Sequence, residues 1–71
     1  MIQFYLQLED NTEIGEGLTD IVPREGEIVS GYDKTIKITK VLYELGVTKQ
    51  DKNFMVTIDY VVLIGKEQEE Y

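Results

Sequence analysis

The stretch of sequence that decides the fold runs from Phe54 to Ile64 and reads FMVTIDYVVLI. Every even-numbered position in it is apolar, whereas the odd-numbered positions of its first half include the polar Thr57 and Asp59. Side chains of a β-strand alternate between two faces, so the pattern predicts one long strand whose even-numbered face is buried. From Val61 onward both faces are apolar, which predicts that a curled sheet, a loop or another subunit covers this half on both sides.

The start of the chain predicts a second strand. In residues 2–8, four apolar residues alternate with side chains that suit a wet face. Residues 9–22 then place aliphatic side chains at helical spacing, but Gly15 and Gly17 lie inside the span and disfavour a helix. We therefore expect residues 9–22 to be a long ordered loop, with at most one helical turn.

Residues 35–45 allow two interpretations. As a helix, apolar side chains recur every three or four residues, and Gly46 stands where a C-cap is common. As a strand, the alternation slips at Thr39 and Lys40, which is what a β-bulge produces. The many β-branched residues favour the strand. A helix at 35–45 would make the protein a compact α+β fold instead.

Polar segments flank the long strand. We expect residues 47–53 to be a mobile connection between two long antiparallel strands. Gly65 is expected to end the second of these strands, and residues 66–71 to form a frayed polar tail. Because no linker or internal repeat is visible, residues 1–71 predict a single small domain.

Composition excludes several kinds of chemistry. The chain has no cysteine and no histidine, which rules out disulfides, thiolate or histidine metal ligands, and histidine acid–base catalysis. No catalytic, metal or phosphate motif is recognisable, so we expect neither an enzyme nor a cofactor or metal. Residues 1–4 lack the features of a signal peptide, and the longest apolar run, residues 60–64, is too short to span a membrane. We expect a cytoplasmic protein without a membrane partner.

The chain is acidic. Fourteen acidic residues against seven basic ones give a net charge of −7, which repels phosphate backbones, so direct nucleic-acid binding is not expected. A charge of this size keeps a small domain soluble, and it could also imitate nucleic acid in a basic groove of another protein. Since lysines lie scattered among the acids, solubility is the simpler interpretation.

Residues 23–30 carry a resemblance to a known kind of fold. Pro23, Gly26, Glu27 and Val29 follow an opening strand and a long loop, and they lead through a short strand into two longer ones. This arrangement resembles small SH3-like β-barrels, a plan found among tiny proteins of bacteria, phages and mobile elements. The resemblance implies an all-β barrel of about five antiparallel strands. Such barrels bind proteins, peptides or nucleic acids, so a fold is implied and no particular function.

Five residues are candidates for contact with a partner. Tyr5, on the polar face of the first strand, and Tyr32, in a turn, could supply rigid contact area. Arg24, the only arginine, sits at a glycine turn where it could grip a carboxylate or phosphate. Val61 and Leu63 belong to the two-sided apolar stretch, which could form an interface between copies of the chain.

Our leading hypothesis is a non-catalytic acidic protein-binding module, for example a phage- or mobile-element-encoded inhibitor that blocks a host defence protein. A second hypothesis is a homo-oligomer that sequesters a small anionic ligand near Arg24 and neighbouring lysines. A third is a structural subunit of a larger assembly that uses residues 61–64 as its interface.

Overall fold

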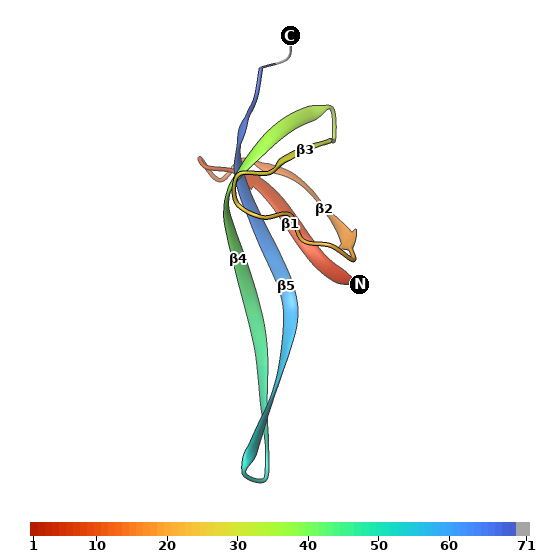
Figure 1. Cartoon of the computed structure of the whole chain (residues 1–71), viewed down its shortest axis with the longest axis vertical. Helices are drawn as coiled ribbons and strands as arrows, with labels where there is room; N and C mark the ends of the chain where they lie inside the picture. Colours follow the sequence, from red (N-terminus) through yellow and green to blue (C-terminus); the bar gives the residue numbers. More distant parts are fainter. Residues whose placement is uncertain (70–71) are drawn as a thin grey trace.

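The computed structural model describes residues 1–69, which contain five β-strands and no helix (Figure 1). The strands form one sheet in the order β2-β1-β5-β4-β3, and the sheet curls into a half-barrel. The predicted all-β class with about five strands is confirmed, and residues 35–45 are strand rather than helix. The five elements are β1 (Ile2–Leu8), β2 (Glu13–Thr19), β3 (Ile28–Gly31), β4 (Lys34–Gln50) and β5 (Asn53–Glu67).

One strand pair differs from the all-antiparallel prediction, because β1 runs parallel to β5. The pairs β1–β2, β3–β4 and β4–β5 are antiparallel. Parallel neighbours need a long connection between them, and here β2, β3 and β4 all lie within that connection. The first and last strands of the chain therefore lie side by side in the middle of the sheet.

Strand β2 occupies the segment that we expected to be a long loop. The two glycines that disfavour a helix there are the places where aromatic rings lie against the strand. A Cβ at Gly17 would be 3.2 Å from the ring of Phe4, and a Cβ at Gly15 would be 2.6 Å from the ring of Tyr32. The glycines thus mark close packing within the sheet rather than a flexible loop.

The core is small and lies where β1, β4 and β5 meet. Partly buried side chains from the other strands and from the connection between β2 and β3 pack around it. Five residues make up the fully buried cluster: Leu6, Ile36, Ile38, Val61 and Leu63.

Strands β4 and β5 continue well beyond the rest of the sheet as a two-stranded arm (Figure 1). We define the arm as residues 43–60, since β1 meets β5 only from Val61 onward and β3 meets β4 only before Ile38. The arm makes the molecule elongated, with principal extents of 56 × 21 × 19 Å. It also corrects the expected mobile connection at residues 47–53, which is paired strand closed by a two-residue turn at Asp51.

Two β-bulges interrupt the β4–β5 pairing. The first lies between Ile38 and Lys40, where the alternation of the sequence slips, so the predicted bulge is confirmed. The second lies in β5. Glu44 is paired with Tyr60, and the next residue of β4 is paired with Ile58, which leaves Asp59 without a partner. Each bulge shifts the alternation of one strand by one residue.

Two features overturn the prediction that even-numbered residues are buried along all of residues 54–64: the arm is uncovered, and the second bulge changes which positions face the core. Phe54 and Val56 lie on the arm and are 63% and 58% exposed, while the odd-numbered Val61 and Leu63 are buried. Because Asp59 adds one unpaired residue, even positions before it and odd positions after it share one face of the sheet. The long strand itself is confirmed; its continuous buried face is wrong.

The end of the chain is also more ordered than expected. Gly65 does not end β5, since it is paired with Ile38 of β4, and the strand continues to Glu67. The backbone N–H of Gln68 then donates a hydrogen bond to the carbonyl oxygen of Thr35 at 2.7 Å. The last two residues of the predicted tail, 70 and 71, lie outside the described residues.

Candidate protein-binding surface

The arm has one apolar and one polar face. Residues opposite each other in an antiparallel pair lie on the same face, and Leu45 is opposite Ile58 while Val47 is opposite Val56. Tyr43 and Phe54 extend this face at its two ends. The six side chains are between 44% and 63% exposed. We call this set the apolar arm face: Tyr43, Leu45, Val47, Phe54, Val56 and Ile58.

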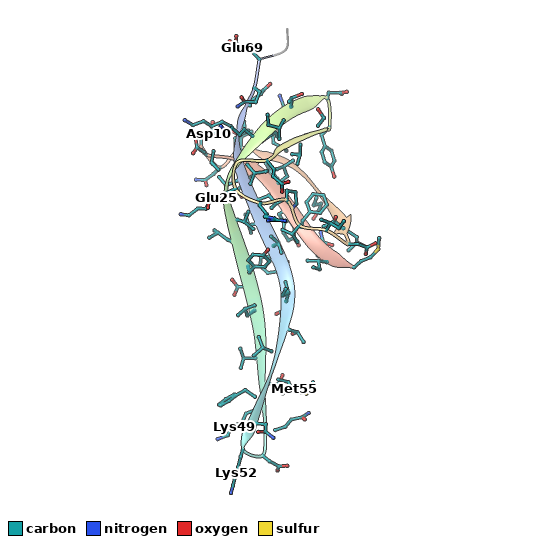
Figure 2. All side chains as sticks on the ribbon, viewed as in Figure 1. Asp10, Glu25, Lys49, Lys52, Met55 and Glu69 are labelled. Carbon is teal, nitrogen blue, oxygen red and sulfur yellow. The ribbon has the colours of Figure 1, made fainter. Side chains whose placement is uncertain are left out.

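The opposite face of the arm is mostly polar. Gly46 is opposite Thr57, and Gln50 is opposite Asn53. Met55, opposite Thr48, is a large exposed apolar side chain on this face (Figure 2). The arm is therefore an amphipathic ribbon whose apolar side is left uncovered by the described part of the chain.

The apolar arm face continues directly into the core. Tyr43 is opposite the buried Val61, and the half-buried Val41 is opposite the buried Leu63. Single exposed apolar side chains are normal on protein surfaces, but a contiguous set of this size marks an interaction site. An isolated two-stranded hairpin is also only marginally stable in water. Both considerations make this face a candidate interaction surface.

Charge is distributed unevenly along the molecule. Residues 45–58 contain Lys49, Lys52 and Asp51 and so carry a net charge of +1, which leaves −8 for the rest of the chain because the whole carries −7. Figure 2 shows the two lysines at the tip of the arm, with Asp10, Glu25 and Glu69 at the other end of the molecule. The molecule thus has a weakly basic tip, residues 45–58, and a strongly acidic body, which here includes Glu44 and Asp59 at the base of the arm.

Few of the acidic side chains are neutralised within the chain. In residues 1–69 two ion pairs are present, Lys34–Glu67 at 3.3 Å and Lys66–Glu9 at 3.8 Å, and both lie on the surface. Exposed pairs of this kind contribute little to stability. The remaining carboxylates leave the body with a negative field that extends into the solvent.

Tyr5, one of the predicted contact residues, is half-buried at the base of the arm. Its ring meets that of Tyr60 edge to face, with ring centroids 5.4 Å apart and an angle of 89° between the planes. This contact connects β1 to β5 where the arm begins. Tyr5 therefore supports the base of the arm, in addition to any contact it makes with a partner.

Tyr32 and Leu63, two other predicted residues, line one cavity of about 160 Å³. Tyr32 is 52% exposed, and its hydroxyl donates a hydrogen bond to the carbonyl oxygen of Glu16 at 2.9 Å. The cavity is mostly apolar and lies on the core side of the sheet, between β1 and the connection that contains Pro23. Tyr32 fixes β2 against the turn between β3 and β4.

Val61 and Leu63 do not lie on the surface. They are 0% and 3% exposed because the sheet curls at this level and packs them against the core side chains of β1 and β4. Their side chains belong to the core of the chain itself and are not available to a partner, whereas Val62 and Ile64 of the same stretch are half-buried. The exposed apolar surface of the hairpin lies further out, on the arm.

Arg24 is exposed in the turn that leads into β3. Its backbone N–H donates to a carboxylate oxygen of Glu27 at 2.6 Å, and its carbonyl oxygen accepts from the backbone N–H of Glu27 at 3.1 Å. These bonds close the turn through the backbone, with Gly26 at φ 90°.

Within residues 1–69, no group of three or more acidic side chains is arranged to hold a metal ion. The described segment also has no helix of the length and apolar character needed to cross a membrane.

Sequence reasoning missed the apolar arm face, although its signal is present. The alternation of residues 54–58 is visible, and it was interpreted as burial within the chain. Leu45 and Val47 repeat the pattern on the other side of the turn at Asp51. The other predicted strands are at most seven residues long, so they cannot cover a hairpin of this length. The excess length of this hairpin over the other strands indicates that its outer part is exposed.

Comparisons with protein-family models, curated proteins and solved structures found no match to this chain.

Proposed function

We propose that this protein is a non-catalytic protein-binding module whose binding element is the arm. The observation that carries the proposal is the apolar arm face, where six large side chains lie together and are each about half exposed. They project from paired strands, so little conformational entropy is lost when a partner covers them. The apolar area, and not a cluster of reactive groups, is what this surface offers to another molecule.

The acidic body would determine which partners approach. A net charge of −8 outside residues 45–58 attracts basic surfaces over distances comparable to the Debye length, about 8 Å at physiological salt. Such steering mainly increases the association rate, while apolar contact determines how long a complex lasts. A small module of this kind acts by covering a surface of its target. An inhibitor that is encoded by a mobile element would block a host protein in this way.

The test uses one matched pair of variants. The double variant Val47→Thr/Val56→Thr makes the central pair of the apolar arm face polar while retaining β-branched side chains. The control, Met55→Thr, removes a large exposed apolar side chain from the polar face of the same arm. Wild type and both variants are immobilised, and the proteins that each captures from a cell lysate are measured by quantitative mass spectrometry.

We expect wild type and Met55→Thr to retain the same partner and the double variant to retain at least tenfold less. Raising the salt concentration should slow capture by both active forms, because it screens the acidic body. Equal capture by all three proteins would show that the arm is not the binding element.

A further inference from the structure

We infer that the apolar arm face binds a second copy of this chain, with the two arms packed face to face and pointing in opposite directions. The inference rests on the proposed function, because it names the partner of the same surface. Three observations carry it: the symmetry of the face, the charge along the molecule, and the area that is left exposed.

The arm has the shape that a symmetric pair requires. In a twofold dimer the same surface contacts itself, so the surface must be complementary to its own copy. The apolar arm face is a twisted ribbon with apolar residues from Tyr43 to Phe54, ending beside Lys49, and with mostly polar residues on its back. Two such ribbons stacked through their apolar faces form a closed two-layer sandwich.

Charge selects the direction in which the arms run. A parallel pair would place two acidic bodies, each of −8, beside one another and the two basic tips together. An antiparallel pair instead places each tip, with Lys49 and Lys52, beside the acidic body of the other copy. Like charges brought together oppose association, whereas the antiparallel pair brings opposite charges together.

The exposed area is sufficient for a specific contact. Six large side chains per copy, each about half exposed, would remove on the order of 1,000 Å² from water when two arms pair. That area reaches the lower range of specific protein interfaces. Tyr43, at the base of the face, adds an aromatic side chain of the kind that dominates such contacts.

The pair also explains why the arm can be so long. Each strand of the arm has only one neighbouring strand, and a hairpin alone is marginal in water. A second ribbon stacked on the apolar face supplies the second layer that the body of the sheet obtains from its own curl. The polar face of each arm, with Thr48 and Thr57, then remains in water.

The experiment measures association and then direction. Sedimentation equilibrium of wild type and Met55→Thr should give twice the mass of the chain, and Val47→Thr/Val56→Thr should dissociate at least tenfold more readily. Circular dichroism checks that the body of the double variant is folded. Direction is measured on the otherwise native arm, so the inference does not depend on that variant. The chain has no cysteine, so Gln50→Cys, on the polar face and beside the turn at Asp51, carries a single spin label at the tip and leaves both lysines in place.

In an antiparallel pair the two tips are separated by about one arm length, roughly 25 Å for the eight residue-to-residue steps from Tyr43 to Asp51. In a parallel pair they would be roughly 10 Å apart, the spacing of stacked sheets. A short label distance would overturn the antiparallel arrangement. A dimer unaffected by the double substitution would overturn the arm as the interface.

A monomeric wild type would also overturn the inference, and the capture experiment then shows whether the proposed function fails with it. If the monomer still captures another protein through the arm, the function stands and the partner is not a second copy. If capture is also unaffected by the double substitution, both proposals fail.

Discussion

Asp59 lies directly over Gly46, so close that a Cβ built on Gly46 would be 2.6 Å from a carboxylate oxygen of Asp59. The hydroxyl of Thr57 donates to the same carboxylate at 3.4 Å. Asp59 is the unpaired residue of the bulge, and the missing side chain of Gly46 leaves room for it on the polar face of the arm. This bulge is what places the residues on both sides of it, Ile58 and Val61, on one face of the sheet.

Deleting Asp59 should leave the two faces of the arm unchanged. A one-residue deletion in a paired strand normally turns every side chain beyond it to the other face. Asp59 has no partner in β4, so its loss leaves Ile58 opposite Leu45. We expect a loss of about 1 kcal/mol or less in the free energy of unfolding, and preserved nuclear Overhauser contacts between these two side chains. Deletion of Thr57, which is paired with Gly46, is the control. It should lower the free energy of unfolding further and abolish the contacts between Ile58 and Leu45.

Gly65→Ala should destabilise the protein by about 1–3 kcal/mol, the usual cost of overpacking. Its Cβ would overlap the side chain of Ile36 and lie 2.5 Å from the carbonyl oxygen of Lys37, which is backbone and cannot rotate away. Gly31→Ala is the matched control, since nothing lies within 4 Å of its Cβ, and it should change stability by less than about 0.5 kcal/mol. Urea unfolding measures both, and equal values would contradict the close approach at Gly65.

The contact between Tyr5 and Tyr60 should be measurable as a coupling energy. Edge-to-face pairs of this geometry contribute about 0.5–1.5 kcal/mol beyond the area they bury. A double-mutant cycle with Tyr5→Leu and Tyr60→Leu, followed by thermal unfolding, isolates that term. Tyr5→Phe keeps the ring and should retain the coupling. If the effects of the two single substitutions on the free energy of unfolding add up to that of the double substitution, the two rings are independent.

Asp10 should titrate below its ordinary range. Hydrogen bonds from the Thr12 side chain first, and then from the Thr12 backbone, lower the pKa of Asp10. A lowered pKa in the folded state favours folding above the ordinary value, and this contribution is lost as the pH falls through the lowered one. The effect on stability should be small because the carboxylate is fully exposed. The carbon-13 shift of the carboxyl, followed against pH, should show a higher midpoint in Thr12→Ala, and identical midpoints would contradict the assignment.

Local patterns in the sequence predicted elements better than they predicted arrangement. The β-branched residues of 35–45 and the slip at Thr39 correctly predicted a bulged strand. The strand of residues 13–19 was missed, because its glycines reflect contacts with Phe4 and Tyr32 that are distant in sequence. Alternation in residues 54–58 correctly placed these side chains on one face, but no local pattern states whether the chain is long enough to cover that face.

The candidate surface was predicted least well for the same reason. Val61 and Leu63 are apolar because β1 and β4 enclose them, and that enclosure depends on a parallel pairing that spans most of the chain. Tyr5 was correctly expected on the face opposite to the core, but its contact with Tyr60 depends on the same pairing. The apolar side chains that remain exposed after folding can be identified only once the order of strands in the sheet is known.

The parallel neighbours β1 and β5 have a consequence for the order of events in folding. Contacts such as Phe4 beside Val61 join residues separated by most of the chain, and such contacts form slowly because a large loop must close first. During synthesis the first hairpin leaves the ribosome long before its central neighbour exists. The hydrophobic cluster can therefore assemble only after Leu63 has emerged, and until then β1 presents a bare edge that chaperones or a neighbouring nascent chain can reach.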